Sequence, residues 1–506
     1  MKALTVPDSG SDPIRFGVLQ SGAALENWQS RCLQQLTSLP DVLAVELPPI
    51  PLQESARAQA LARVRDCNLD FLLCFIEGPL PQDILDVARH GAWRYQLGDW
   101  LNYRGPGGGF WEVYDHSPVS AVLLVRMTAD PDVIVVLREA VLRTQALSVS
   151  KNRHQLLSGF THWPAQVCRD IRLGKFAALD TQAARRARAA ARPAPNAWHR
   201  AVLSARTALR IAATGFHSLF RHDQWNIGIV DSPIEQFISM SGPPQAEWLT
   251  ATPRSEFRAD PFGTLHDGRA TILYEHFSYR DQLGYIVAIE TPGSPGSRVH
   301  IGPEKPVHLS YPFLFEAGGQ LLCVPESSAA KEIALYEIER FPDRWKKVAT
   351  LIAERELVDA TLFQYDARWW LAASDLAEKG ANSELHLWFA PNLSGPWQPH
   401  PGNPVKVDVR SARPAGAPFW VGDQLYRPAQ DCSSSYGARV SINRITALTP
   451  TEFREEVAAT VNPDPRGEYP CGLHTLSRFG ARTLIDGKRS VFVPAEFFRV
   501  LRHYLR

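Results

Sequence analysis

The chain has 506 residues, more than a single domain usually holds, so we expect two domains, each with its own core. Its 54 Lys and Arg residues nearly cancel its 53 Asp and Glu residues. Without an overall positive charge the chain lacks the field that attracts nucleic acid, and we expect no nucleic-acid partner.

The cysteines and the N-terminus indicate in which cellular compartment the protein is expected. The seven cysteines are odd in number and scattered, with no CxxC pair that would suggest zinc binding or redox chemistry. Reduced thiols of this kind are typical of the cytosol. The N-terminus has no apolar run of signal-peptide length, and no stretch of about 18 uninterrupted apolar residues could span a bilayer. We therefore expect a cytoplasmic protein that needs no metal and no cofactor.

Residues 1–180 alternate short apolar runs with helical patterns. The apolar runs lie at 14–19, 42–47 and 69–76, and a helical pattern covers 28–39. Strands separated by helices are typical of an α/β domain built on a parallel sheet. We predict such a domain, of the Rossmann type, over this part of the chain.

Residues 181–224 are predicted to be a basic linker and helix. An Ala/Arg run, two prolines and a basic helical segment follow one another here, which is typical of a domain boundary. Between residues 198 and 221, apolar residues alternate with Arg200, Arg206 and Arg210. Such a helix can lie on an anionic membrane surface, so we expect peripheral membrane contact. The alternative is a helix that packs one domain against the other.

Residues 225–506 have a different pattern, in which short β-rich runs are interrupted by turns about every 50 residues. Each turn lies between two apolar runs, as in a β-hairpin. The turns are at 266–268, 317–319, 366–368, 422–424 and 479–481. Five such units predict a five-bladed β-propeller. The alternative is a β-sandwich with irregular hairpins.

In a propeller the first strand of each blade runs beside the central channel and the second returns to the same rim. Polar residues at the starts of first strands and at the ends of second strands should therefore converge on one opening. At the starts of first strands lie Asp260, His308, Tyr311, Asp359, Arg413 with Arg410 nearby, and His474; at the ends of second strands lie Glu275, Glu326, Asp375, Gln430 and Asp431.

This collection is rich in carboxylates and costly to bring together unless a polar ligand, such as a glycan, satisfies it. Neighbouring carboxylates can have different pKa values, so that one donates a proton while another stays ionised, as cleavage of a glycosidic bond requires. We predict that Asp260, Glu326 and Asp359 are catalytic. We predict that the remaining residues bind substrate, namely Glu275, His308, Tyr311, Arg410, Arg413, Gln430, Asp431 and His474.

Each of these residues also has a purely structural interpretation. Asp260 precedes a proline and fits a turn that leads into a strand. Glu275 and Glu326 could pair with an arginine at the edge of a blade. Arg410 and Arg413 could tie blades together, and His474 could be a structural histidine. The repeated placement at one rim, more than any single residue, favours a site.

Several ordered motifs of the second domain resemble a known family. The motifs FRADPF, HLSYPFLF, VPESSAAKEIALYEI, VDATLFQYDARWWL, NPVKVDVRSARPAG and RPAQDCSSSYGARV resemble the propeller region of the glucosamine inositolphosphorylceramide transferase family. In the plant members this region precedes a glycosyltransferase domain that this chain is too short to include, so the resemblance does not carry the transferase activity over. The region also resembles five-bladed furanosidase-type enzymes, in which an Asp-Pro dipeptide of the first blade matches Asp260.

The first domain resembles formyltransferases, through LENWQSRCLQQL and GAWRYQLGDWLNYRGPGGGFWEVYD. The resemblance places Arg94 at the catalytic Asn position and Gln96 at the catalytic His position, while Asp132 retains the acidic position. A glutamine cannot act as a general base, so we expect this domain to be inactive as a formyltransferase.

Three functions remain open at this level. The first is an enzyme that transfers or hydrolyses a glycosyl unit during the assembly of a cell-surface polysaccharide or glycolipid. The second is a protein that only binds a glycan or a nucleotide sugar. The third is a sugar-amine N-formyltransferase with an altered catalytic set. The expected partner is accordingly a glycan, a glycolipid or a nucleotide sugar.

Overall fold

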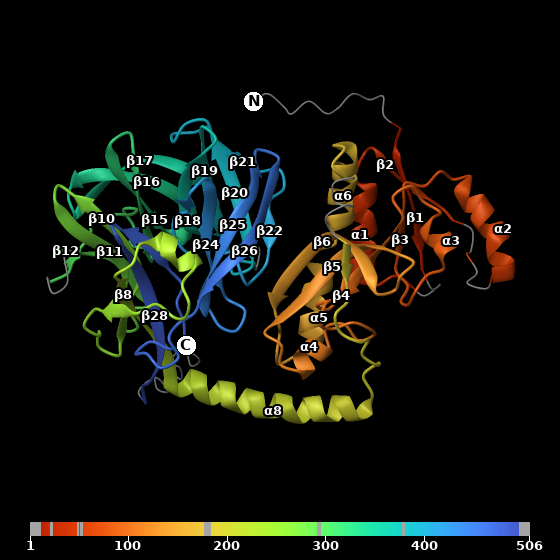
Figure 1. The fold of residues 1–506 in the computed structure, drawn as a ribbon, viewed down its shortest axis with the longest axis horizontal. Coiled ribbons are helices and arrows are strands. Elements are labelled where there is room, and N and C mark those ends of the chain that lie inside the picture. Colours follow the sequence, from red (N-terminus) through yellow and green to blue (C-terminus); the bar gives the residue numbers. More distant parts are fainter. Residues whose placement is uncertain are drawn as a thin grey trace. The chain divides into compact units, whose positions relative to one another are not determined.

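A computed structural model describes residues 12–20, 24–47, 50, 54–176, 184–290, 295–376 and 380–494, without the side chains of 54–56 and 218. The chain divides into two compact units, Met1–Ala208 and Leu209–Arg506. Across the described ranges, no helix is both long and apolar enough to cross a membrane. Figure 1 shows the two units, whose positions relative to one another are not determined.

The first unit contains one mixed sheet with the strand order β2-β1-β3-β4-β5-β6-β7. Strands β2, β1, β3 and β4 are parallel, and β4 to β7 pair antiparallel. The strands are β1 (Ile14–Leu19), β2 (Val42–Val45), β3 (Phe71–Cys74), β4 (Ala92–Leu97), β5 (Val119–Met127), β6 (Val133–Arg143) and β7 (Ala184–Arg186). The unit is therefore mixed α/β, and the predicted parallel sheet forms only its first part.

The helices of this unit cover the sheet and connect its strands (Figure 1). They are α1 (Asn27–Thr37), α2 (Glu54–Arg65), α3 (Gln82–Leu85), α4 (Trp111–Tyr114), α5 (Val149–Ser158) and α6 (Trp163–Arg172). A capping box at the start of α1, in which Glu26 and Gln29 bond reciprocally to backbone, satisfies amides that a helix leaves without partners. Phe16, Phe71 and Trp93 from adjacent strands stack at ring distances of 5.4 and 3.9 Å and form part of the core.

The segment predicted as a linker contains two regular elements. Strand β7 adds to the edge of the first sheet by pairing with β6. Helix α8 (Ala197–Phe220) follows, and the division between the two units falls within it. Strand β8 begins directly after α8, before residue 225.

The described part of the second unit forms five sheets, each with a main path of four strands (Figure 1). We call them blades 1 to 5. Blade 1 holds β10 (Glu256–His266), β11 (Arg269–Ser278), β12 (Leu283–Glu290) and β13 (Ser297–Arg298); blade 2 holds β14 (Ser310–Ala317), β15 (Gln320–Glu326), β16 (Glu332–Arg340) and β17 (Arg344–Ala353). Blade 3 holds β18 (Leu357–Tyr365), β19 (Arg368–Asp375), β20 (Glu384–Ala390) and β21 (Gln398–Pro399), with β22 (Lys406–Val407) beside β20.

Blade 4 holds β23 (Phe419–Val421), β24 (Gln424–Asp431), β25 (Arg439–Thr449) and β26 (Glu452–Val461). Blade 5 combines both ends of the unit, because β27 (Leu476–Phe479) and β28 (Arg482–Phe492) pair with β8 (Arg221–Val230) and β9 (Ala246–Trp248). Figure 1 shows β8 beside β28. This pairing closes the ring and covers the edge that an open sheet would leave exposed. Short 3-10 helices lie at Ile234–Ile238 (η1) and Ser328–Ala330 (η2).

All five predicted hairpin turns join the first and second strands of a blade, so the five-bladed prediction is confirmed and the β-sandwich alternative is wrong. The turn residues adopt the left-handed backbone that two-residue hairpins require. In blade 1 the φ angles of Asp267 and Gly268 are 49° and 75°, and in blade 3 those of Asp366 and Ala367 are 49° and 54°.

Candidate functional site on the propeller axis

Three inner strands share an irregularity at the place where polar residues were predicted. Pairing between the first and second strands shifts at 259–262 in blade 1, at 310–313 in blade 2 and at 358–361 in blade 3. The residue in each shift has a left-handed backbone, with φ of 52° at Asp260, 42° at Tyr311 and 53° at Asp359. This conformation costs on the order of 1–3 kcal/mol in a residue other than glycine and is enriched at functional sites. Three blades therefore bear the same strain at equivalent positions.

Asp359 lies in the first of two buried ion-pair groups. The Arg413 Nε atom donates to Asp359 Oδ2 at 2.5 Å, and Gln430 Nε2 donates to the same oxygen at 2.9 Å. The Asp359 amide donates to Glu326 Oε2 at 3.2 Å, which brings in the end of strand β15. This group therefore combines Glu326 of blade 2, Asp359 of blade 3, and Arg413 and Gln430 of blade 4.

Asp260 lies in the second group. Its Oδ1 atom accepts from Thr475 Oγ1 at 2.9 Å and lies 3.5 Å from His474 Nε2. The other ring nitrogen of His474 lies 2.6 Å from Asp486 Oδ2, and the same Asp486 oxygen accepts the Asp260 amide at 3.1 Å. The Tyr311 amide donates to Asp260 Oδ2 at 3.3 Å. Blades 1, 2 and 5 therefore meet at this carboxylate.

The two groups influence one another electrostatically. Burial raises the pKa of Asp260 to about 7, with further upward contributions from Glu275, Asp359 and Asp486 and a downward one from His474. Burial, followed by the charge of Asp359, raises the pKa of Glu326 well above its usual range. Glu326 therefore keeps a proton at neutral pH, and Asp260 gains or loses one near pH 7.

His474 and Asp486 form the opposite case. Burial by itself would lower the pKa of His474, but the charges of Asp486 and Asp260 outweigh it and raise that pKa. Burial would raise the pKa of Asp486, yet the adjacent imidazolium and the backbone amides that it accepts keep this pKa below its ordinary value. The pair is therefore ionised, and the His474 ring stacks on Trp225 at 4.1 Å.

Two predicted residues form a pair at the edge of the cluster. His308 Nε2 lies 3.2 Å from Glu275 Oε1, and its Nδ1 accepts the Gly284 amide at 3.0 Å. This pair raises the pKa of His308, although burial acts in the other direction.

Two predicted binding residues do not join the cluster. Arg410 is exposed and makes two hydrogen bonds of 2.8 Å to Asp408, so its guanidinium group forms a surface pair. Asp431 accepts the Ser433 amide and lies 3.3 Å from Arg439 Nε, which makes it a structural carboxylate of blade 4. The structure thus gives each of these two residues a local partner outside the cluster, and their role in binding stays a prediction.

Sequence reasoning missed four members of the cluster: Asp486, Thr475, Tyr436 and Asn382. The Tyr436 ring lies 5.1 Å from the Arg413 guanidinium carbon, and Asn382 Oδ1 accepts from Arg413 Nη1 at 2.9 Å. Asp486 had a usable signal, since it is the acidic residue in the second strand of the fifth hairpin. Tyr436 and Asn382 lie in connecting segments and had none.

One group in the described ranges has metal-ligand character: Asp260, His474 and Asp486, whose ligand atoms all lie within 4.8 Å of one another. A histidine ligand must be neutral and offer a lone pair to the ion. Here each ring nitrogen of His474 faces a carboxylate, and its pKa is raised. The arrangement fits a histidine held between two acidic side chains better than a metal site.

The raised pKa of Asp260 predicts how propeller stability depends on pH. Because the folded pKa, about 7, exceeds the ordinary 3.8, the folded state retains a proton that the unfolded state releases. Stability should therefore fall as pH rises from about 4 to about 7, by on the order of 3 kcal/mol. The neutral Asp260→Asn variant should lack this fall, and chemical unfolding of both proteins at several pH values measures the difference. Parallel pH profiles would contradict the assignment.

The residues singled out in the first unit also meet in one place. Arg94, Gln96 and Arg104 line a single pocket, and Asp132 forms an ion pair with Arg104. Gln96 Nε2 donates to the Leu97 carbonyl at 3.0 Å. The substituted positions are thus neighbours, as the resemblance implied.

Five sheets closed into a ring, with carboxylates and cations of different blades gathered at the ends of first and second strands and in the segments that precede first strands, define the second unit as a β-propeller with a polar axial site. Residues 245–474 match the family model described as "Glucosamine inositolphosphorylceramide transferase 1, N-terminal". The family resemblance predicted from the motifs is confirmed for this region.

Curated relatives lie in plants. Glucosamine inositolphosphorylceramide transferase 1 of Oryza sativa subsp. japonica is 35% identical over 207 residues, which cover 40% of this chain and 28% of the relative. The protein of the same name from Arabidopsis thaliana is 33% identical over 241 residues, 46% of this chain and 31% of the relative. The chain thus spans less than a third of the length of these relatives.

Solved structures with weak similarity to this chain include two enzymes. A family 117 glycoside hydrolase of Zobellia galactanivorans is 14% identical with a TM-score of 0.33, covering 49% of this chain and 77% of its own. Glycinamide ribonucleotide transformylase 1 of Symbiobacterium toebii is 15% identical with a TM-score of 0.27, and the match covers 33% of this chain and 94% of that protein. At these TM-scores neither similarity defines a fold.

Proposed function

We propose that the propeller binds a glycosyl unit at its axis and catalyses its transfer or hydrolysis. The observation that carries this proposal is the placement of two carboxyl groups with raised pKa values, Glu326 and Asp260, in one cluster with Asp359, whose carboxylate accepts a hydrogen bond from Arg413. Reactions at a glycosidic bond need an acid that protonates the leaving oxygen and a carboxylate that stays charged. Neighbouring carboxyl groups whose environments differ in this way meet that need.

The proposed roles follow from the contacts. Glu326 is partly buried and is the general acid, because its raised pKa keeps a proton available at neutral pH. Asp359 is the carboxylate that stays charged, since Arg413 and Gln430 both donate to it. Asp260, between His474 and Tyr311, exchanges a proton near pH 7 and so serves as the second acid or base.

The substrate class is proposed from the family. The plant relatives are named for transfer involving glucosamine and an inositolphosphorylceramide, which supports a glycolipid or a related glycan as the molecule handled here. We propose a place in the assembly of a cell-surface glycolipid or polysaccharide. Separate substitution of Asp260 and Glu326, with binding and turnover measured in parallel, tests the proposal. Binding by the intact protein without any turnover would favour the alternative, a glycan-binding protein.

For the first unit we propose a formyltransferase-like domain without formyltransferase activity. Formyl transfer needs a base that takes the proton of the amine, and Gln96 cannot act as one. Its side-chain amide is also engaged with the Leu97 carbonyl. The altered N-formyltransferase considered above therefore has no support from these contacts.

We also propose that α8 contacts an anionic membrane surface. Its 24 residues include no acidic side chain, and Trp198, Leu209, Ile211 and Phe216 are 54 to 73% exposed. Apolar side chains beside basic ones favour the interface of an acidic bilayer. The protein should sediment with phosphatidylserine-containing vesicles at low salt, and 0.5 M salt should weaken this binding.

The matched variant Leu209→Glu, Phe216→Glu should bring sedimentation with acidic vesicles down to the level of pure phosphatidylcholine vesicles. Absence of sedimentation by the intact protein at low salt would instead support a helix that only packs between the two units.

A further inference from the structure

The first unit contains a pocket of about 670 Å³. It lies where the parallel strands β3 and β4 end, beside the start of α1 and the segment 75–80 that follows β3. Ligands of open α/β sheets bind at this edge. Four aromatic residues are among those that line it: Trp28, Phe75, Tyr95 and Trp100.

Two arginines of this pocket lack a carboxylate partner within the part of the chain that the structure describes. Arg94 donates from Nη1 to the Gly78 carbonyl at 2.6 Å, and Arg153 donates from Nη1 to the Gly108 carbonyl at 2.9 Å. Both side chains are partly buried, and burial lowers the pKa of Arg94. A guanidinium group has five N–H donors and remains charged in proteins, so each retains donors for a ligand. The charge of Glu77, an exposed residue that also lines the pocket, acts to raise the pKa of Arg94, but within the described residues the two form no ion pair.

Two acidic residues that line the pocket, Glu26 and Asp130, have partners of their own. Glu26 caps α1 and accepts from Trp28 Nε1, while Asp130 pairs with Arg186 at 2.6 Å and accepts the Asp132 amide. Asp132 in turn pairs with Arg104. The positive charges of Arg94 and Arg153 are therefore available to a ligand.

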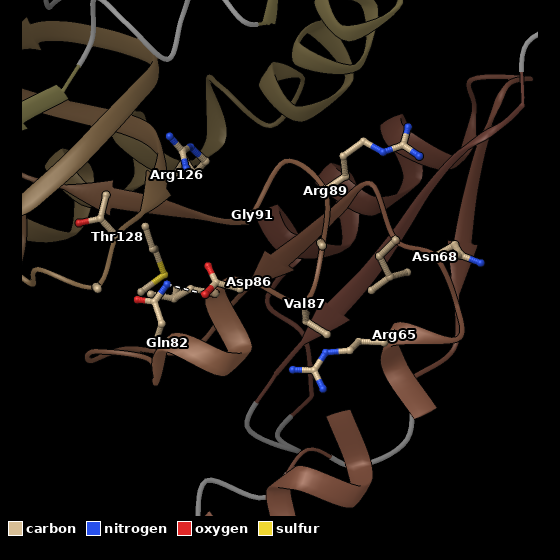
Figure 2. A pocket seen from close by; sticks show the side chains of 14 residues that line it. Arg65, Asn68, Gln82, Asp86, Val87, Arg89, Gly91, Arg126 and Thr128 are labelled. Carbon is tan, nitrogen blue, oxygen red and sulfur yellow. Dashed lines mark hydrogen bonds between the residues drawn. The ribbon is translucent and has the colours of Figure 1, made fainter. Parts of the chain in front are cut away.

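A second hollow of the same unit, about 590 Å³, is built differently. Figure 2 shows that the guanidinium groups of Arg65, Arg89 and Arg126 on its rim extend in different directions and do not converge. Arg89 is 76% exposed and lies 3.4 Å from Asp70. Arg89 thus belongs to a surface ion pair and provides a matched control.

We infer that the pocket of the first unit binds an organic anion, in which a phosphate or carboxylate group contacts Arg94 and Arg153 and a planar apolar body lies against the aromatic residues that line it. The planar guanidinium group of arginine suits a phosphate as well as a carboxylate, because it can donate two parallel, charge-assisted hydrogen bonds to either. The inference concerns the first unit by itself and does not depend on the function proposed for the propeller.

The test titrates the full chain with 1-naphthyl phosphate and 1-naphthoate, and with uncharged 1-naphthol, by calorimetry. At least one anion should bind more tightly than naphthol. Arg94→Gln and Arg153→Gln should each weaken anion binding about tenfold, because each removes a charged hydrogen bond. Arg89→Gln should bind as the unmodified protein does. Whichever anion binds more tightly identifies the group that the pocket prefers.

A second measurement covers the case in which a variant fails to fold. Phenylglyoxal modifies accessible arginines, and mass spectrometry locates the modified positions. Bound naphthyl phosphate or naphthoate should protect Arg94 and Arg153 in the unmodified protein, and leave Arg89 reactive. Equal affinity for naphthol and both anions, or the same protection at all three arginines, would overturn the inference.

Discussion

Replacing Asp260 by asparagine or Glu326 by glutamine is expected to lower turnover of the sugar substrate by about 10²- to 10⁴-fold, the usual contribution of a general acid or base. Each substitution removes a titratable proton and nearly preserves the shape of the side chain. In the native protein the two Asp260 oxygens accept from Thr475 Oγ1 and from the Tyr311 amide; the asparagine keeps one acceptor oxygen for these donors, so ligand binding should change less than turnover.

Nucleotide-sugar donors and 4-nitrophenyl glycosides serve as probes for turnover, and calorimetry with the same compounds measures binding. Asp366→Asn is the matched control, because this aspartate lies at a hairpin tip in a left-handed conformation that asparagine tolerates. Unchanged turnover in both test variants would remove Asp260 and Glu326 from the chemistry.

Replacing Arg413 by alanine is expected to lower the free energy of unfolding of the propeller by about 3 to 5 kcal/mol, as is usual when one partner of a buried ion pair is removed. The side chains of Arg413 and Asp359 are only 10% and 3% exposed. Without the guanidinium group, Asp359 keeps the Gln430 amide as a donor but faces Glu326 with its charge uncompensated.

Guanidinium unfolding of the full chain, with hydrogen exchange in β18 and β24 to identify the propeller transition, measures this loss. The double variant Arg413→Ala, Asp359→Asn should regain part of the stability, because it removes the orphaned charge. Arg410→Ala is the matched control: its surface pair with Asp408 should contribute within about 0.5 kcal/mol. Equal effects of the two alanine substitutions would show that Arg413 is not a buried counter-charge.

The architecture of the second unit could be predicted from sequence because its signals are local. Each hairpin turn is specified by a few residues that accept a left-handed backbone, as Asp267 and Gly268 do in blade 1. Repetition at a near-constant spacing then implies blade stacking. The predicted convergence of Asp260, Glu326 and Asp359 rests on strand direction, and in the structure the Asp359 amide donates to Glu326.

The tertiary structure decided which polar residue pairs with which, because side-chain partners depend on positions that are distant in sequence. Arg413 reaches the buried Asp359 of another blade, whereas Arg410, three positions earlier, binds its neighbour Asp408 at the surface. Asp486 enters the site because β28 pairs with β8, a contact between the two ends of the unit that no local pattern encodes. The raised pKa of Asp260 likewise arises from burial between three blades, a property of packing that sequence alone does not contain.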